Sequence, residues 1–272
     1  MNSYTNIFDT FNTIKPIIIQ RFRTYLQNSR TSPRGRKRQL DLEIFFTAFY
    51  SNLRDATSPS NFKLYFGLPK STYFHYLKLL RQSQIVDNLE REITNNYTLG
   101  PTLAADTFTV KSHNGHEGVG RNNTDRGRNG VKVQIISDIE GVIQHLDTSS
   151  ANTHDSKIFT NTLTAHNETY SGREILMDAA YIGRPVRTTA TNYGLIPIVV
   201  PKRKANGQPT HALTDLQKLK IKKRWYIERQ IGVLRRFKAV SNKYAKTLAT
   251  YKFFLAFSKL LVNYYYLKPD FP

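Results

Sequence analysis

The segment KLKIKKRWYIERQIGVLRRFK, residues 218–238, places one carboxylate, Glu228, inside the densest run of positive charge in the chain. A helix over roughly 213–238, at about 100° per residue, would carry an apolar stripe made of Leu216, Leu219, Ile227, Ile231, Leu234 and Phe237. Arg224, Glu228 and Arg235 fall along the edge of that stripe. Two interpretations of Glu228 are open. It forms a surface ion pair with Arg224, which contributes about 0.3–0.5 kcal/mol, or it is a metal-binding carboxylate whose partners lie elsewhere in the chain.

The charge of the protein is large and unevenly distributed. The 272 residues carry a net charge of +20, with a pI near 10.0. Residues 202–246 alone hold 14 lysines and arginines against two acidic residues, which is more than half of the excess. A basic chain of this kind favours a polyanionic partner, either nucleic acid or an anionic membrane surface, and concentration in one patch favours nucleic acid.

The composition also excludes several classes of protein. No stretch approaches the roughly 18 apolar residues of a membrane span, and no signal-peptide core is present, so we expect a soluble protein that is not exported. Its location would be cytoplasmic and nucleoid-associated in a prokaryote, or nuclear in a eukaryote. The absence of cysteine excludes disulfides and cysteine-ligated zinc or iron–sulfur sites.

Residues 1–98 are predicted to form a helical DNA-binding region. A helix within 1–29 precedes the run RTSPRGRKR at 30–38, which is either a solvated linker or a basic arm that lies along phosphates. A helix from Asp41, a short helix at 62–66, a break at 67–69 and a helix from Ser71 together resemble a helix-turn-helix, although any small three-helix bundle looks similar. The residues expected to face a DNA groove are Lys70, Ser71, Thr72, Tyr73 and His75. The polar stretch 87–100, which ends in Gly-Pro, predicts the domain boundary.

From Thr102 the pattern changes from helical to strand-like. Strands are predicted at 103–111, 131–138 and 142–147, with a Gly/Asn/Arg-rich loop at 112–130 between the first two. A helix starting within 152–159, a buried strand that begins at Glu174 and ends in Asp178, a helix at 184–192 and a strand at 195–200 follow, before helices at about 213–238 and 244–266. This order predicts a ribonuclease-H-like α/β domain over residues 99–272.

Two of these strands carry an aspartate where an apolar run breaks, Asp106 after Leu-Ala-Ala and Asp178 after Ile-Leu-Met. A carboxylate beside apolar residues is unfavourable unless it is paired or binds a cation. Asp106, Asp178 and Glu228 together therefore suggest a shared metal site. Oxygen-only ligands favour Mg²⁺ or Mn²⁺ over Zn²⁺, and two such ions can activate the attacking oxygen and stabilise the leaving oxygen of a phosphodiester.

The ordered set of motifs resembles a known family. The motifs are AADT at 104–107 with Lys111, SDIEG at 137–141, ANTHD at 151–155, MDAAY at 177–181, RWYIER at 224–229 and RRFK at 235–238. In this order they resemble the DDE transposases of bacterial insertion sequences, in the group marked by a Tyr/Arg/Glu/Lys signature, with Harbinger-type transposases as eukaryotic relatives. The resemblance covers about residues 102–266.

The resemblance implies both an activity and a set of site residues. Asp106, Asp178 and Glu228 would be the catalytic triad that binds Mg²⁺ or Mn²⁺, and the protein would cut at transposon ends and join the freed 3′-OH to target DNA. Arg224 keeps the signature arginine, Arg235 replaces the lysine, and Ile221 stands where the signature has tyrosine. The partners would be double-stranded DNA and a second copy of the chain, in a dimer or larger synaptic complex.

Other assignments remain open. The expected phosphate contacts of the catalytic domain are Lys111, Lys132, Arg224, Arg229, Arg235 and Arg236. Asp138 is interpreted as a turn residue, and Asp155 with His154 as a helix cap, so these acids rank behind the triad. The alternatives in function are a non-catalytic DNA-binding or regulatory protein derived from a transposase, and a nuclease that acts on RNA hybrids.

Overall fold

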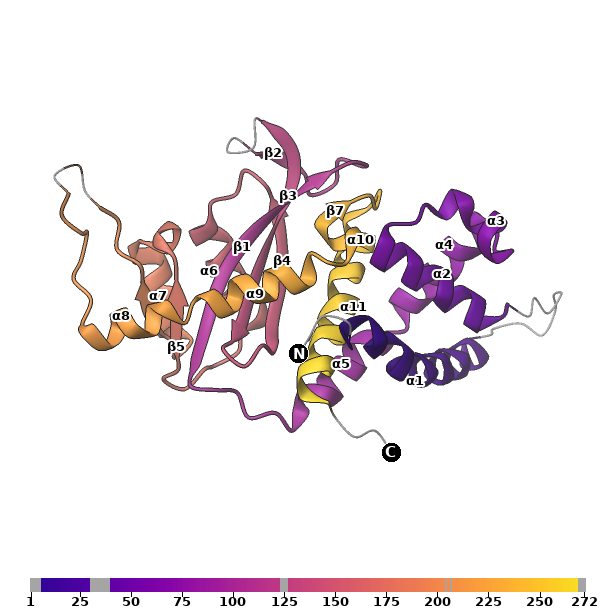
Figure 1. Ribbon diagram of the computed structural model, residues 1–272, viewed down its shortest axis with the longest axis horizontal. Coiled ribbons are helices and arrows are strands. Elements are labelled where there is room, and N and C mark those ends of the chain that lie inside the picture. The colour runs from indigo at the N-terminus through magenta and orange to yellow at the C-terminus, as the bar shows by residue number, and fades with distance from the viewer. Residues whose placement is uncertain (1–5, 30–39, 123–126, 204, 206, 269–272) are drawn as a thin grey trace.

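The protein is a mixed α/β structure in which one sheet lies beside a group of N-terminal helices (Figure 1). The computed structural model describes residues 6–29, 40–122, 127–203, 205 and 207–268. The predicted basic arm at 30–38 lies outside these residues. Within the described ranges, no helix combines the length and the apolar character that crossing a membrane requires.

The N-terminal part is helical, as the sequence predicts. It consists of α1 (Asn6–Asn28), α2 (Leu42–Asp55), the 3-10 turn η1 (Pro59–Asn61), α3 (Phe62–Phe66), α4 (Lys70–Gln82) and α5 (Ile85–Asn95). Asp41 caps α2 by accepting a hydrogen bond from the backbone of Glu43, which satisfies one free N–H of the first turn. Gly67 ends α3 in the left-handed region, at φ 65°, and so allows the sharp turn before α4. Helix α5 occupies much of the stretch predicted as a polar boundary, so that prediction missed a helix.

The sheet is mixed. Its strands are β1 (Thr102–Ser112), β2 (Gly120–Asn122), β3 (Arg128–Asp138), β4 (Ile143–Ser150), β5 (Glu174–Met177), β6 (Ile196–Val199) and β7 (Asn242–Lys243). β1 pairs antiparallel with β3 and β3 antiparallel with β4, while β1 pairs parallel with β5 and β5 parallel with β6. The predicted loop at 112–130 thus contains β2 and the start of β3. Strand β1 lies at the centre of the sheet, between β3 and β5.

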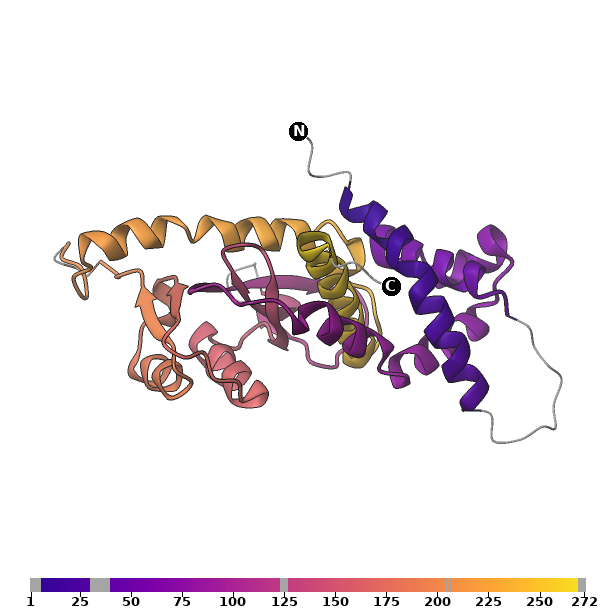
Figure 2. The same ribbon diagram turned by 90° about the horizontal axis from the view of Figure 1, so that it is seen from below.

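The two faces of the sheet pack against different helices. Helix α6 (Asp155–His166), the 3-10 turn η2 (Ala179–Tyr181) and α7 (Arg184–Asn192) cover one face, and α9 (Trp225–Leu234) lies across the other (Figure 2). Alternate residues of β1 enter the two cores: Ala104 and Phe108 pack toward α9, and Leu103 and Ala105 toward α6 and α7. Asp106 therefore lies on the α9 side of the sheet and Thr107 on the α6 side.

The helix predicted at 213–238 is broken in the structure. It forms α8 (Asp215–Lys222), α9 and α10 (Lys238–Ser241), with Arg224 at the junction between α8 and α9. Ile227, Ile231, Leu234 and Phe237 are buried as predicted. Leu216 and Leu219 are each 60% exposed, so their place in the stripe was predicted wrongly, because the break turns α8 away from the core that α9 contacts.

The last helix, α11 (Leu248–Leu267), joins the two parts of the molecule. It packs against α1, α5, α9 and β4. Phe257 contacts Phe11 of α1 and Phe49 of α2, with ring centroids 6.2 and 4.7 Å apart. One apolar core therefore runs from the N-terminal helices through α11 to the sheet.

Candidate active site

The register of two neighbouring strands brings Asp106 and Asp178 side by side. Ala105 of β1 pairs with Met177 of β5 in parallel register, and each aspartate is the next residue along its strand. Asp178 follows the end of β5 and caps η2, where its Oδ1 accepts a hydrogen bond of 2.8 Å from the backbone of Ala180. Burial raises the pKa of Asp106, and the negative charge of Asp178 acts in the same direction. The two carboxylates are thus close enough to interact electrostatically.

Arg224 connects this pair to Glu228. Its Nη1 donates to Asp106 Oδ2 at 2.8 Å, and its Nη2 donates to Glu228 Oε1 at 3.0 Å. The Asp106 and Arg224 side chains are 17% and 20% exposed, whereas Glu228 is 60% exposed. The predicted ion pair between Arg224 and Glu228 is therefore present, and the same guanidinium also neutralises Asp106.

The three acids share one region but do not form a closed ligand set. In the described part of the chain, the carboxylate oxygens of the three acids do not all lie within 4.8 Å of one another. The guanidinium of Arg224 separates Asp106 from Glu228 and contributes to this spacing. A metal ion bound by all three acids would require Arg224 to move.

The chemistry of these residues fits a hard divalent cation. All three donors are carboxylates, and the Asp106 carboxylate already pairs with a cation, the guanidinium of Arg224. Mg²⁺ and Mn²⁺ bind preferentially to such oxygen ligands. An ion of this type would be held by Asp106, Asp178 and Glu228.

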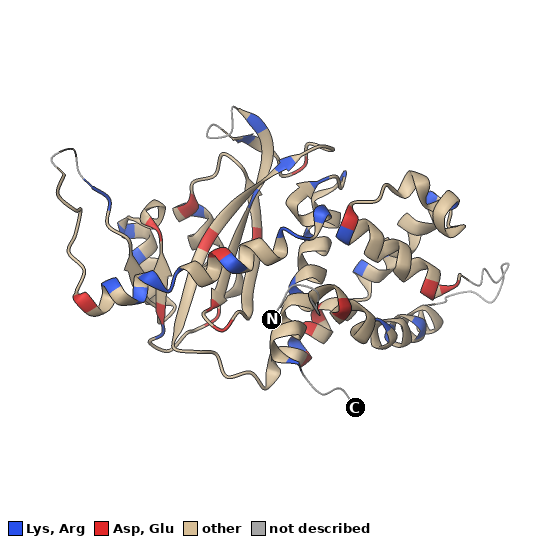
Figure 3. Cartoon of the chain, in the orientation of Figure 1, with Lys and Arg blue, Asp and Glu red and all other residues tan. Residues whose placement is uncertain are grey.

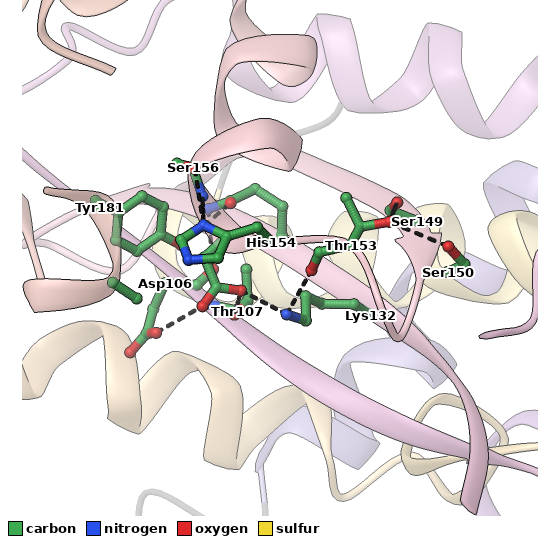
Figure 4. Close-up of polar contacts among 12 residues, drawn as sticks. Asp106, Thr107, Lys132, Ser149, Ser150, Thr153, His154, Ser156 and Tyr181 are labelled. Atoms are coloured by element: carbon green, nitrogen blue, oxygen red, sulfur yellow. Dashed lines mark hydrogen bonds and ion pairs between the residues drawn. The ribbon is translucent and has the colours of Figure 1, made fainter. Parts of the chain in front are cut away.

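Asp155, which ranked behind the triad, lies on the opposite face of the sheet from Asp106. Its Oδ1 accepts hydrogen bonds of 2.8 Å from Thr107 Oγ1 and from Lys132 Nζ. Lys132 also donates to the Thr153 carbonyl (Figure 4). The Lys132 side chain is only 14% exposed. The Lys132 ammonium is held by an internal ion pair in this structure, and its contact with phosphate stays a prediction.

A hydrogen-bonded chain that the sequence analysis missed reaches Asp106 through its backbone. Gln134 is fully buried in β3 and donates from Nε2 to the carbonyl oxygen of Asp106 at 3.0 Å. Its Oε1 accepts from the Tyr181 hydroxyl at 3.1 Å. Tyr181 belongs to the same motif as Asp178, and a buried glutamine in an apolar strand is the signal that could have revealed this contact.

Asp138 is a turn residue, as the sequence interpretation has it. It is fully buried, and its Oδ1 accepts hydrogen bonds of 2.9 Å from the backbone N–H groups of Gly141 and Val142. The Tyr97 hydroxyl donates to its other oxygen. These bonds hold the connection between β3 and β4. Asp138 pairs with Leu103 of β1, three residues before Asp106, so the turn lies near the proposed site but not in it.

Basic side chains surround the acids. Lysines and arginines gather along α8 and at its junction with α9 (Figure 3). The guanidinium of Arg235 lies 5.6 Å from the ring centroid of Phe108, two residues after Asp106 on the same face of β1. A pocket of about 550 Å³ opens beside it, lined by Phe8, Arg54, Asp55, Arg235, Arg236 and Lys238. Arg229 and Lys111 are exposed.

The predicted groove-facing residues of α4 differ in exposure. Lys70, Ser71 and His75 are exposed, and Thr72 is partly buried. Tyr73 is fully buried, and its hydroxyl donates to Asn52 Oδ1 at 3.1 Å. The prediction that Tyr73 faces a DNA groove is therefore wrong, because its ring belongs to the core between α2 and α4.

Comparisons with known proteins point to one family. The family model described as transposase DDE domain matches residues 98–263. Among solved structures, the piggyBac transposase in its synaptic complex with hairpin DNA has a TM-score of 0.56 at 10% identity, covering 96% of this chain and 74% of that one.

Two further comparisons add less. The Mos1 transposase paired-end complex with the left transposon end covers 79% of this chain and 82% of that one at 10% identity, and its TM-score of 0.26 is too low to inform the fold. No curated protein matches the sequence. The family match spans well over half of the 272 residues, and the chain therefore belongs to the transposase DDE domain family.

Proposed function

We propose that this DNA transposase cuts DNA at the ends of its element and joins the freed 3′-OH to target DNA, using Asp106, Asp178 and Glu228. The observation that carries the proposal is the meeting of these acids at one place. Strand register sets two of them side by side, and Arg224 links the third to the first. Family membership supplies the reaction class.

The residues have separate roles in this proposal. A bound Mg²⁺ or Mn²⁺ supplies Lewis-acid activation of phosphodiester oxygens. Asp106 and Asp178 provide fixed ligands from the sheet, and Glu228 provides a ligand from an exposed helix position that can adjust. Arg224 exchanges its carboxylate partners for a DNA phosphate, which a guanidinium can bind through two hydrogen bonds. Arg235, held over Phe108, lies beside the same site.

The strand arrangement supports a ribonuclease-H-like catalytic domain. Along the chain, β1, β3 and β4 are followed by α6, β5, α7 and β6, which is the order of elements predicted for that fold. We further propose that α3 and α4 act as a helix-turn-helix, in which Lys70, Ser71 and Thr72 approach the DNA, and that the helical region ends near residue 98. The motif order supports placement near insertion-sequence and Harbinger-type transposases, with a prokaryotic or nuclear location respectively.

The DNA partner would lie over basic residues of α9 and β1. Arg229, Arg235 and Arg236 lie on or just after α9, and Lys111 lies on β1. Transposition needs two DNA ends held together, so two copies of the chain in a synaptic complex are the expected assembly. The piggyBac transposase, to which the chain is similar in fold, forms a synaptic complex, in line with this expectation.

The test is a cleavage and strand-transfer assay with duplex DNA taken from the sequences that flank the gene. Wild-type protein should nick at inverted repeats in Mg²⁺ or Mn²⁺, and Asp106→Asn should reduce cleavage by 10³-fold or more while DNA affinity stays within about twofold. Asp215→Asn removes an exposed acid of α8 and should be silent, since its side chain is 96% exposed.

Each alternative function gives a different result. Cleavage that survives in Asp106→Asn would refute the assigned site. DNA binding without any metal-dependent cleavage of flanking DNA would favour a non-catalytic regulator. Preferential cleavage of an RNA–DNA hybrid of the same sequence would favour a ribonuclease.

A further inference from the structure

A cluster of metal-ligating side chains lies at the end of α6 away from the proposed active site. The cluster consists of His145, His166 and Glu168. In the described ranges, these are the three potential metal ligands whose ligand atoms all lie within 4.8 Å of one another. Asp155 begins α6 and His166 ends it, so the cluster lies about 16 Å from Asp155 along the helix axis. It uses none of the triad residues.

The fold brings these residues together from two segments. His145 and Asp147 lie two apart on β4 and therefore project from the same face, toward α6. His166 is the last residue of α6, and Asn167 follows in the left-handed conformation, at φ 52°. This turn sends Glu168 and Tyr170 back toward His145. The convergence thus depends on how α6 ends against β4.

The distances within the cluster are close to those of a ligand set. His145 Nε2 lies 3.5 Å from Glu168 Oε2, and the two imidazole rings have centroids 4.0 Å apart. Ligand atoms about 2.0–2.1 Å from a tetrahedral Zn²⁺ ion are roughly 3.3–3.4 Å from one another. The two ligand atoms that are farthest apart, at most 4.8 Å from each other, would have to move closer by about 1.5 Å at most. The exposed His166 and Glu168 side chains can make this adjustment, while the buried His145 provides a fixed position.

The surrounding groups match the second layer of a metal site. His166 Nε2 lies 3.0 Å from Asp147 Oδ2, which leaves Nδ1 of His166 for an ion and fixes the orientation of the ring. Metal-binding histidines usually make such a contact with a carboxylate. The Tyr170 hydroxyl is hydrogen-bonded to His145 Nε2 and would move from that nitrogen when an ion binds. The two carboxylates, Asp147 and Glu168, balance the charge of a dication.

We propose that His145, His166 and Glu168, oriented by Asp147, form a structural site for a borderline transition-metal ion, with Zn²⁺ as the expected occupant. Two imidazole nitrogens favour Zn²⁺ over Mg²⁺, which prefers oxygen ligands. The ion would fasten the C-terminal end of α6 to β4 in a chain that has no cysteine for a disulfide. This proposal is independent of the proposed function.

The experiment titrates ZnCl₂ into untagged protein that carries Asp106→Asn, Asp178→Asn and Glu228→Gln, so that the proposed active site cannot contribute. Thermal unfolding should shift upward by about 5–10 °C when Zn²⁺ is in 100-fold excess over its Kd. MgCl₂ at the same concentration should give no comparable shift. Co²⁺ should give the visible absorption of a four-coordinate ion with nitrogen ligands.

Variants then assign the ligands. His166→Asn and Glu168→Gln should each weaken Zn²⁺ binding at least about tenfold, and Asp147→Asn by about 10–100-fold. These positions are partly or largely exposed, so folding should survive. Tyr170→Phe removes a competing hydrogen bond and should leave the Zn²⁺ affinity equal or higher. His113→Asn, which changes a histidine outside the cluster, is the matched control.

Two outcomes would overturn the proposal. One is the absence of a Zn²⁺-dependent shift in the triad-free protein. The other is a Zn²⁺-dependent rise in unfolding temperature that is as large in the His166→Asn variant as in the protein without that change. Such a result would assign the effect to other surface groups. Because the titrated variant lacks all three triad carboxylates, either outcome leaves the result of the cleavage assay on the wild-type protein unaffected.

Discussion

Arg224 and Asp106, 118 positions apart in the sequence, form an ion pair with a distance of 2.8 Å between Nη1 and Oδ2. The arginine occupies the space between a sheet carboxylate and a helix carboxylate where a dication would bind. In the metal-free protein it keeps these charges compensated. Arg224 and the ion are therefore expected to compete for the same two acids.

Arg224→Gln should raise the Mg²⁺ affinity of the triad by about two- to fivefold, the equivalent of losing a partly exposed ion pair. Cleavage should nevertheless fall, because the phosphate contact is lost with the guanidinium. Calorimetric titration with Mg²⁺ measures the first effect without involving the histidine cluster. Arg229→Gln, an exposed arginine of the same helix, is the control, and a weaker Mg²⁺ affinity in Arg224→Gln would contradict the competition.

Asp138→Ala should impair folding more than chemistry. The change leaves the buried N–H groups of Gly141 and Val142 without their acceptor, so the free energy of unfolding should fall by about 2–4 kcal/mol. Urea denaturation measures the loss. At a temperature where the variant is folded, cleavage should remain within a fewfold of wild type. A loss of cleavage as large as that of Asp106→Asn, in folded protein, would move Asp138 into the catalytic site.

Tyr73→Phe and Lys70→Gln should separate stability from DNA binding in α4. Tyr73→Phe should lower the free energy of unfolding by about 1–2 kcal/mol, because Asn52 loses a buried partner, and leave DNA affinity unchanged. Lys70→Gln should leave stability unchanged, weaken DNA binding and reduce the slope of log K against log salt by about one. Salt-dependent anisotropy titrations distinguish the two. An unchanged slope in Lys70→Gln would place the DNA elsewhere.

Trp225 offers an optical report on α9. It is the single tryptophan of the chain, is 50% exposed, and stacks on Tyr226 with ring centroids 4.0 Å apart. DNA that contacts Arg224 should change its environment, so its fluorescence should change with the same Kd as an independent binding assay. Fluorescence that stays constant while DNA is bound would show that the DNA does not reach this helix.

The ion pair between Arg21 and Glu92 should make a small pH-dependent contribution to stability. Two hydrogen bonds of 2.7 and 2.8 Å from Arg21 lower the pKa of Glu92. The stabilisation is therefore present above the ordinary pKa of glutamate and is lost as the pH falls through the lowered value. Both side chains are substantially exposed, so it should amount to less than about 1 kcal/mol.

Urea unfolding of wild type and Glu92→Gln tests this prediction. The difference between the two proteins at pH 7 should disappear as the pH falls through the lowered pKa of Glu92. Arg21→Gln should show the same behaviour, since either change removes the pair. A difference that persists in acid would have another cause.

The sequence predicted the elements that have strong local patterns. The acids Asp106 and Asp178 interrupt apolar runs, and this pattern was sufficient to single out both, although β1 continues past Asp106 to Ser112 and only Asp178 lies at the end of its strand. The helix predicted at about 184–192 is present as α7, and Pro185 in its first turn is typical of a helix start.

Features that depend on tertiary contacts were missed. Helix α5 has mostly polar residues, yet Ile85, Val86, Leu89 and Ile93 form its buried face against α11. No Gly or Pro marks the break at Arg224, which arises where α8 packs on β5 and β6 while α9 packs on β1 and β3. The burial of Tyr73 could have been inferred, since Tyr73, Leu77 and Leu80 have helical spacing.

The position of α11 between the N-terminal helices and the sheet has a consequence for synthesis on the ribosome. The apolar faces of α1 and α2 emerge some 200 residues before the phenylalanines of α11 that cover them. During that interval the nascent chain exposes aromatic surface, which makes it a substrate for chaperones. Under the proposed function, DNA cutting should then appear only after Leu267 has left the exit tunnel, and incomplete chains should be inert toward the genome that encodes them.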